Sequence, residues 1–296
     1  MADPTTTPHL SDLQRSSGGF AMLAVDQREA MRNMFAEHTD EPVSDAHVTA
    51  FKVDATRILS PYASAVLIDR QFGWDPVVQA GVVDEGCALI AAADHFASAH
   101  GELVGEISID YDVDPATVRD QGARAMKLLV IYRPDTDPGE RIAMVEEFVS
   151  RCRDAGLVSI IEPVSRAPVS GARWDWDEGV LAAARELGSL GADLYKGEVP
   201  LRGQGPEDEI RRRCADITRA VDSPWVVLSS GVPEDIFPSA VRLACLEGAS
   251  GFLAGRAVWA SSIGRDDVEA DLRTAAVARL KHLGEVVDEV VGKAGI

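Results

Sequence analysis

The stretch DPGERIAMVEEFVSRCRDAGLVSIIEPV, residues 137–164, decides the fold, because it holds a helix followed directly by a buried strand. Asp137-Pro138 is a typical helix start, with a capping side chain and a proline at the first helical position. Apolar residues then recur at helical spacing, at Ile142, Val145, Phe148, Val149 and Cys152. Gly156 ends the helix just before the strand Val158–Ile161, which is apolar on both faces, as in a covered parallel sheet.

The same alternation of strand and helix runs through the chain. The predicted strands are Phe20–Val25, Ala65–Ile68, Ala88–Ala92, Ala125–Val130, Val158–Ile161, Ala192–Tyr195, Trp225–Leu228 and Gly251–Leu253. The helix start recurs at Asp75-Pro76 and Asp114-Pro115. Eight strands alternating with helices predict an α/β protein with a single (β/α)8 TIM barrel over residues 10–296. No G-x-G-x-x-G follows a strand, which disfavours the alternative of a doubly wound open sheet.

The chain ends and the composition set further expectations. Residues 1–9 are predicted to be a disordered tail, Leu10–Arg15 a short helix that closes the barrel, and Val268–Val291 the final helix. The chain shows no secretory signal or membrane-length apolar run, and its four cysteines are scattered, so a cytoplasmic protein is expected. A net charge of −19 argues against nucleic acid and anionic membranes as partners. Because such barrels often associate, a homo-oligomer is expected.

Lys196 lies in the middle of the stretch ADLYKGEVP, residues 192–200, which is predicted to contain a buried strand. Burial disfavours the charged form of Lys196, and a neutral amine can attack a carbonyl group. The alternative is a lysine at a strand end that reaches out to water. Charged residues at other strand ends favour the nucleophile; they are Asp26, Lys127, Glu162 and Arg256. This combination predicts Schiff-base chemistry on an anionic carbonyl substrate.

Active sites of such barrels lie at the carboxyl ends of the strands, so residues at those ends are the catalytic candidates. Glu162 is the candidate for proton transfer, and Asp26 for orienting substrate hydroxyls or the Schiff base. For both carboxylates the alternative is a simple ion pair with a lysine. Lys127 either anchors substrate oxygens or acts as a cation close to Lys196.

The ends of the last two predicted strands indicate an anion site. Small residues there let backbone N–H groups approach an oxyanion, and an arginine can bind it through two hydrogen bonds. The segment Ala257–Ser262 is expected to form a short helix whose N-terminus adds partial positive charge. The alternative is that the glycines only form tight turns. The residues concerned are Ser229, Ser230, Gly231, Gly255 and Arg256.

A second anionic group of a substrate has fewer candidate partners. Gln27 and Arg28 follow the first strand, and Arg166 lies in the loop Val164–Arg173, a candidate lid. Their spacing does not distinguish a sulfonate from a phosphate. No metal cofactor is expected, because only His95 of the six histidines lies at a strand end, whereas a zinc site needs several converging imidazoles.

Six segments of the chain closely resemble the sulfofructosephosphate aldolases, relatives of the class I tagatose-1,6-bisphosphate aldolases. These segments are GGFAMLAVDQREAMR (18–32), LSPYASAVL (59–67), SIIEPV (159–164), ADLYK (192–196), LSSGV (228–232) and GFLAGRAVW (251–259). The resemblance implies metal-independent cleavage of 6-deoxy-6-sulfofructose 1-phosphate to dihydroxyacetone phosphate and sulfolactaldehyde, in sulfoglycolysis. The alternatives are a tagatose-1,6-bisphosphate aldolase and a non-catalytic sugar-phosphate binding protein.

The resemblance also implies roles for individual residues. Lys196 resembles the Schiff-base lysine of these enzymes, and Glu162 resembles their acid/base residue. The implied phosphate cradle consists of Ser230, Gly231, Gly255 and Arg256. The implied polar shell of the active site consists of Asp26, Gln27 and Lys127. A silent binding protein would have no use for both lysines and Glu162 together.

Overall fold

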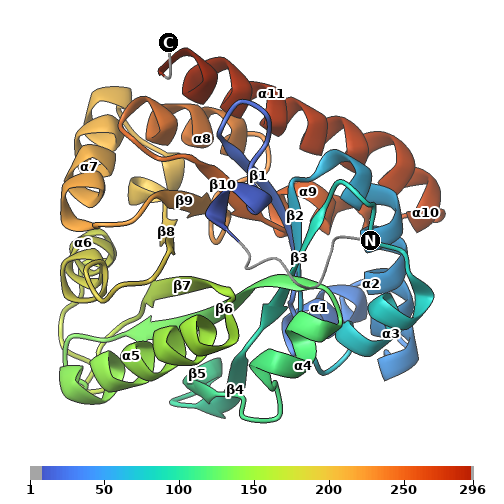
Figure 1. The fold of residues 1–296 in the computed structure, drawn as a ribbon, viewed down its shortest axis with the longest axis horizontal. Helices are drawn as coiled ribbons and strands as arrows, with labels where there is room; N and C mark the ends of the chain where they lie inside the picture. Colours follow the sequence, from blue (N-terminus) through green and yellow to red (C-terminus); the bar gives the residue numbers. More distant parts are fainter. Residues whose placement is uncertain (1–8, 295–296) are drawn as a thin grey trace.

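The computed structural model describes residues 9–294, which form a closed barrel of eight parallel strands surrounded by helices (Figure 1). Neighbouring strands follow the order β1-β10-β9-β8-β7-β6-β3-β2. The strands are β1 (Phe20–Val25), β2 (Ala65–Ile68), β3 (Ala88–Ala92), β6 (Ala123–Tyr132), β7 (Val158–Ser165), β8 (Leu194–Glu198), β9 (Trp225–Leu228) and β10 (Gly251–Ala254). The predicted TIM barrel is confirmed. Of the predicted disordered tail, residues 1–8 lie outside the described residues.

Helices follow the strands along the chain. The α-helices are α1 (Glu29–Ala36), α2 (Asp45–Leu59), α3 (Trp74–Ala80), α4 (Pro115–Asp120), α5 (Pro138–Ala155), α6 (Trp176–Leu187), α7 (Glu207–Ala220), α8 (Phe237–Leu246), α9 (Arg256–Trp259), α10 (Val268–Asp271) and α11 (Val277–Ala294). Short helical turns are η1 (Leu10–Leu13), η2 (Ser60–Tyr62), η3 (Pro200–Gly203), η4 (Ala260–Ser262) and the π-helical η5 (Leu272–Ala276). The predicted final helix is therefore α10, η5 and α11 in succession.

Two of the three predicted Asp-Pro helix starts have the expected geometry. The Asp137 side chain accepts a hydrogen bond from Gly139 N–H, and the Asp114 side chain accepts one from Thr117 N–H. The prediction for Asp75 is wrong, because α3 begins one residue earlier, at Trp74. The N–H of Trp74 already bonds to the carbonyl oxygen of Asp69, so the helical turn is under way before the proline.

Side-chain alternation along the strands builds the site. In β8, Leu194 and Lys196 share the face that points into the barrel, and Leu194 packs in an apolar cluster with Phe20, Met22 and Ile160. In β7 the same alternation places Glu162 one step above Ile160. The barrel interior is therefore apolar in its lower layers and charged at its carboxyl end.

Strand β8 differs from its prediction, Ala192–Tyr195, at both ends. Asp193 precedes the strand, and its carboxylate accepts hydrogen bonds from the backbone and hydroxyl of Ser159. Pairing with β9 extends the strand through Lys196 to Glu198. The loop predicted at Val164–Arg173 is also shorter, because pairing with β6 carries β7 to Ser165.

The hairpin of β4 (Asp94–Ala99) and β5 (Glu102–Ile109) was not predicted. These antiparallel strands follow β3 and form a separate sheet outside the barrel. Most of their residues are exposed or only partly buried, whereas the predicted strands are apolar on both faces. The sequence feature that marks this hairpin is the pair His100-Gly101. These two residues form the turn, and both have positive φ, at 54° and 75°.

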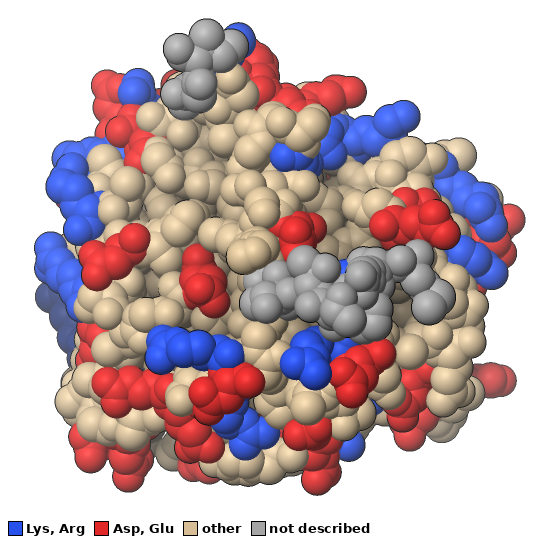
Figure 2. Space-filling model, viewed as in Figure 1, with Lys and Arg blue, Asp and Glu red and all other residues tan. Residues whose placement is uncertain are grey.

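Acidic and basic side chains are interspersed over the face seen in Figure 2, without a broad basic surface. No helix within residues 9–294 is both long and apolar enough to cross a bilayer.

Candidate active site

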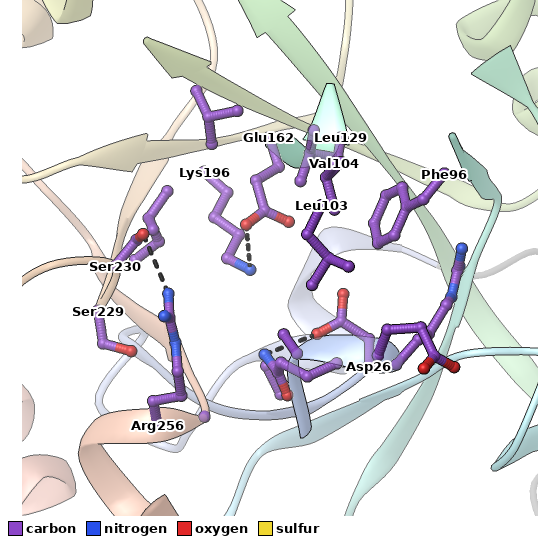
Figure 3. A pocket seen from close by; sticks show the side chains of 18 of the residues that line it. Asp26, Phe96, Leu103, Val104, Leu129, Glu162, Lys196, Ser229, Ser230 and Arg256 are labelled. Carbon is purple, nitrogen blue, oxygen red and sulfur yellow. Dashed lines mark hydrogen bonds and ion pairs between the residues drawn. The ribbon is translucent and has the colours of Figure 1, made fainter. Parts of the chain in front are cut away.

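A cavity of about 460 Å³ opens at the carboxyl end of the barrel (Figure 3). Most of the residues predicted for the site line it; they are Asp26, Gln27, Arg28, Glu162, Arg166, Lys196, Ser229, Ser230, Gly255 and Arg256. Lys127 and Gly231 are absent from the lining. The strand ends thus converge on one pocket, as the topology of a parallel barrel requires.

Lys196 and Glu162 form an ion pair at the floor of this pocket. The Nζ atom of Lys196 lies 2.9 Å from Oε1 of Glu162, and the side chains are only 4% and 9% exposed. The two carboxylate oxygens of Glu162 face two lysines. Its Oε2 lies 3.1 Å from Nζ of Lys127. The carboxylate therefore links the amine that reaches the pocket to a second, deeper cation.

Lys127 is fully buried beneath the pocket, among three carboxylates. Its Nζ lies 2.6 Å from Oδ2 of Asp94, 2.8 Å from Oδ2 of Asp26 and 3.1 Å from Oε2 of Glu162. Burial alone would lower the pKa of Lys127, but these carboxylates raise it well above its ordinary value. A permanently charged lysine without access to the cavity holds the carboxylates in place. The alternative expectation, that it anchors substrate oxygens, does not fit this position.

Asp26 faces the pocket from the end of β1. Burial alone would raise its pKa, but the positive charges of Lys127 and Lys196 hold the pKa of Asp26 well below its usual range. Its other oxygen accepts a hydrogen bond of 3.2 Å from the side-chain amide of Gln27. Asp26 is therefore a constant negative charge that can accept hydrogen bonds from hydroxyl groups in the pocket.

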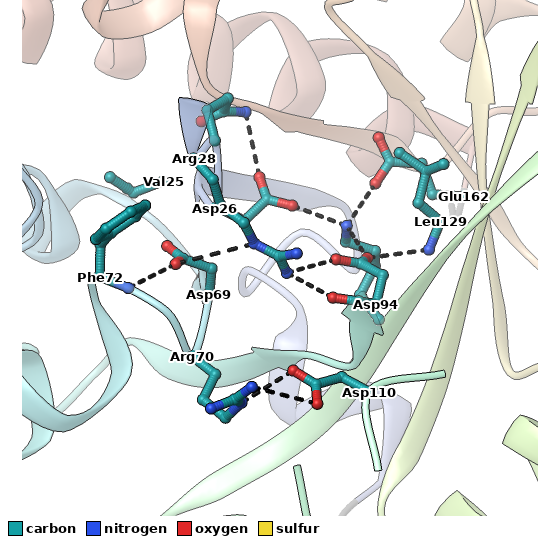
Figure 4. Close-up of polar contacts among 12 residues, drawn as sticks. Val25, Asp26, Arg28, Asp69, Arg70, Phe72, Asp94, Asp110, Leu129 and Glu162 are labelled. Carbon is teal, nitrogen blue, oxygen red and sulfur yellow. Dashed lines mark hydrogen bonds and ion pairs between the residues drawn. The ribbon is translucent and has the colours of Figure 1, made fainter. Parts of the chain in front are cut away.

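Arg28 lines the pocket, and one nitrogen of its guanidinium is held within the protein by Asp94 (Figure 4). Its Nη2 donates to Oδ1 and to the backbone oxygen of Asp94, at 2.8 and 2.7 Å. The guanidinium also lies 4.2 Å from the ring centre of Phe96. We infer that Arg28 holds the base of the β4–β5 hairpin, which sequence reasoning had not placed near the site.

A further buried lysine supports the end of β1 from behind. Nζ of Lys52 lies 2.6 Å from Oδ1 of Asp69 and donates to the backbone oxygens of Val25 and Gln27. These contacts fix the backbone on both sides of Asp26. Lys52 lies in α2, away from the predicted strand ends, so the strand-end argument could not find it.

The residues predicted for an anion site lie together at the ends of β9 and β10. The exposed guanidinium of Arg256 donates a 3.0 Å hydrogen bond to the hydroxyl of Ser230. Gly255 has no room for a side chain, since a Cβ there would lie 2.2 Å from the backbone oxygen of Ala24. Gly231 has a φ of 73°, which favours glycine and forms the turn after β9. The predicted short helix is present as α9 and η4.

The β4–β5 hairpin contributes pocket residues that the sequence analysis missed. Phe96, Ser98, Leu103 and Val104 line the cavity. Figure 3 shows Phe96 and Leu103 across the pocket from Ser230 and Arg256. The His100-Gly101 turn is the signal that could have located them.

Comparison with known proteins agrees with this geometry. A family model described as DeoC/LacD family aldolase matches residues 20–261. The chain belongs to the DeoC/LacD aldolase family. It is thus a carbon–carbon lyase, and the family favours an enzyme over a silent sugar-phosphate binding protein.

This aldolase is similar in sequence to tagatose 1,6-diphosphate aldolases. It is 27% identical to that of Listeria monocytogenes over 314 residues, covering 95% of this chain and 90% of the relative. It is 28% identical to tagatose 1,6-diphosphate aldolase 2 of Enterococcus faecalis over 307 residues, covering 94% and 91%.

Solved aldolases share the fold. An archaeal fructose 1,6-bisphosphate aldolase superposes with a TM-score of 0.63 at 17% identity, over 94% of this chain and 97% of that one. The Plasmodium falciparum fructose-bisphosphate aldolase gives a TM-score of 0.70 at 16% identity, over 95% and 93%.

The carboxylates that could bind a metal are engaged by cations. Among residues 9–294, no group of three or more His, Cys, Asp or Glu side chains is arranged to hold a metal ion. Asp26, Asp94 and Glu162 surround the ammonium of Lys127. Independence from metals stays a prediction for this aldolase.

Glu198 gives a prediction for stability. Burial raises the pKa of Glu198 to about 7, although the backbone N–H of Ser165 donates to its carboxylate. Between its ordinary pKa of 4.5 and a pH of about 7, Glu198 is protonated in the folded state and ionised in the unfolded state. Its contribution to stability is therefore fully present at low pH and is lost as the pH rises through 7. As the pH rises from 5 to 8, the wild type should lose stability that Glu198→Gln keeps. We therefore expect the unfolding free energy of Glu198→Gln to rise by on the order of 2 kcal/mol relative to that of the wild type over this range.

Urea unfolding at the two pH values measures this gain. The matched control is Glu37→Gln, an exposed carboxylate at the end of α1, which should follow the wild-type pH dependence. An equal pH dependence for Glu198→Gln and the wild type would contradict the prediction.

Proposed function

We propose that this aldolase is a class I enzyme that forms a Schiff base through Lys196 and cleaves 6-deoxy-6-sulfofructose 1-phosphate. The products are dihydroxyacetone phosphate and sulfolactaldehyde. The observation that carries the chemistry is the 2.9 Å contact between Nζ of Lys196 and Oε1 of Glu162 at the floor of the pocket. The sulfosugar itself is supported by the resemblance of six segments to the sulfofructosephosphate aldolases.

The contact lets a proton pass between the two side chains. Glu162 accepts a proton from the Lys196 ammonium, and the free amine attacks the C2 ketone of the substrate. Glu162 then returns this proton as the carbonyl oxygen leaves as water. Two of the three hydrogens on the Lys196 ammonium thus end in the departing water. The third hydrogen and the positive charge remain on the nitrogen of the iminium.

The iminium draws the electrons of the C3–C4 bond. The Glu162 carboxylate removes the C4 hydroxyl proton, the aldehyde departs, and a neutral enamine remains. Glu162 returns the proton to C3, and water hydrolyses the iminium to give dihydroxyacetone phosphate and the lysine ammonium. Lys127 keeps its charge throughout, so it stabilises Glu162 whenever this side chain is in its carboxylate form.

The phosphate on C1 is proposed to bind at Ser230 and Arg256, with backbone N–H groups near Gly231 and Gly255. Lys196 on β8 is separated from β10 only by β9 in the barrel order. Ser229 also lines this side of the pocket. Asp26 and Gln27 would orient the sugar hydroxyls, and Arg166 lies toward the other end of the substrate.

The decisive experiment compares kcat/KM of the purified aldolase for 6-deoxy-6-sulfofructose 1-phosphate and tagatose 1,6-bisphosphate. A preference for the sulfonated ketose is expected. A preference for the bisphosphate would support the second candidate, a tagatose-1,6-bisphosphate aldolase. The names of its relatives from Listeria monocytogenes and Enterococcus faecalis favour that candidate.

Arg256→Gln tests the anion site. The side chain is exposed in the pocket and contacts only a neutral hydroxyl there, so the variant should fold normally. Loss of a charge-assisted contact to a phosphate is expected to raise KM about 10- to 100-fold. The control is Arg265→Gln, an exposed arginine that does not line the pocket. Steady-state kinetics with an unchanged KM for Arg256→Gln would remove this residue from the phosphate site.

A further inference from the structure

Two arginines that line the pocket follow different strands of the barrel, and they differ in their surroundings. Arg256 follows β10, and Arg166 follows β7, three strands away around the barrel. In the part of the chain that the structure describes, Arg256 pairs with no carboxylate, and its side-chain partner is the hydroxyl of Ser230. Arg166, in contrast, lies beside Glu102, with Nε 3.6 Å from Oε2.

Glu102 is the first residue of β5, and its two oxygens face two arginines. Its Oε1 lies 2.9 Å from Nη2 of Arg133, which is buried, and its Oε2 faces Arg166. The hairpin that carries Glu102 is held at its base by Arg28 through Asp94. The Glu102 carboxylate therefore has a defined position beside Arg166, which lines the pocket, whereas Arg133 does not.

We propose that Glu102 is a specificity-determining residue that reduces the positive charge at the Arg166 end of the pocket, so that this end favours a singly charged group over a doubly charged one. The inference rests on the proposed function and deepens it. A sulfonate carries one negative charge, whereas a phosphate monoester carries nearly two at neutral pH. Glu102 does not itself line the cavity, and it acts through its contact with Arg166, where its negative charge disfavours the second negative charge of a phosphate.

The remaining lining of this end is mostly uncharged or already paired. Phe96, Leu103 and Val104 of the hairpin present apolar surface to the cavity. Arg28 forms an ion pair with Asp94, so its charge is partly neutralised. Of the three arginines that line the pocket, Arg256 pairs with no carboxylate among the described residues and suits a dianion, whereas Arg28 and Arg166 are each partly neutralised by a carboxylate. This asymmetry matches a ketose with a phosphate on one end and a monoanion on the other.

The size of the expected effect follows from exposure. The side chains of Glu102 and Arg166 are 33% and 32% exposed, so water screens the repulsion substantially. We expect Glu102→Gln to raise the ratio of kcat/KM for tagatose 1,6-bisphosphate to that for 6-deoxy-6-sulfofructose 1-phosphate about 3- to 10-fold. Because the change concerns one end of the substrate, the yield of borohydride-trapped adduct with dihydroxyacetone phosphate should stay at the wild-type level.

The matched control is Glu106→Gln, which removes the same charge from the same hairpin. Glu106 lies on β5, and its ion-pair partner is His100 rather than an arginine that lines the pocket. The ratio of kcat/KM for the two ketoses should be the same in Glu106→Gln as in the wild type. Glu102→Ser removes the charge with a different side chain, so a folding defect in one Glu102 variant leaves the other for the measurement.

An unchanged ratio in both Glu102 variants, or an equal change in Glu106→Gln, would overturn the inference while leaving the proposed function intact. If the wild type cleaves neither ketose, the proposed function fails, and the inference fails with it. These outcomes are distinguishable, because the first requires an active wild-type enzyme and the second an inactive one.

Discussion

Lys196→Met is expected to abolish covalent capture of the substrate and to lower kcat/KM at least about 10⁴-fold. Methionine fills a similar volume but has no amine, so no iminium can form. Incubation with dihydroxyacetone phosphate and sodium borohydride should add a reduced adduct to the wild type only, measured by intact mass. Because Glu162 keeps its contact with Lys127, the variant should remain folded.

The control for this experiment is Lys281→Met. Lys281 is an exposed lysine of α11 whose ammonium lies 5.3 Å from the ring centre of Tyr62, outside the pocket lining. The Lys281→Met variant should form the reduced adduct and cleave the substrate at the wild-type rate. A reduced adduct on Lys196→Met at a comparable rate would show that another amine is the nucleophile.

Lys127→Met should have the largest effect on stability. The substitution leaves Asp26, Asp94 and Glu162 without the cation that lies within 3.1 Å of all three. Removing one partner of a buried ion pair typically costs about 3–5 kcal/mol of unfolding free energy. We expect a loss of at least this size in urea unfolding, together with loss of activity.

The pKa shifts of Asp26 and Lys127 give the pH dependence of their contribution to wild-type stability. Asp26 has a depressed pKa, so its contribution to stability is present above its unfolded pKa and is lost only in strong acid. Lys127 has a raised pKa, so its contribution is present below its unfolded pKa and is lost only in strong base. The contribution of this ion-pair group to the stability of the wild type should therefore be constant between about pH 6 and pH 9.

A second substitution checks the cause. Asp94→Asn removes the carboxylate closest to Lys127, at 2.6 Å, and should recover part of the stability of Lys127→Met. Strictly additive effects of the two substitutions would contradict a direct interaction. Lys281→Met serves again as the control for loss of a surface lysine.

The fold could be predicted because each strand and helix carries its own signals. Strands such as β1, β2, β3 and β9 have the predicted bounds, since apolar runs buried on both faces are rare outside parallel sheets. The β4–β5 hairpin escaped the same reasoning because its strands are half exposed. Its pocket residues were missed for that reason alone.

The sequence by itself determined that Asp26, Glu162, Lys196 and Arg256 would meet, because the carboxyl ends of parallel barrel strands converge on one mouth. Only the tertiary structure decided which charges face one another. Lys127 and Arg28 are cations at strand ends by sequence, yet one is enclosed by three carboxylates and the other is held by Asp94. Charge pairing depends on distances of a few ångströms between residues far apart in the chain, and strand spacing does not contain that information.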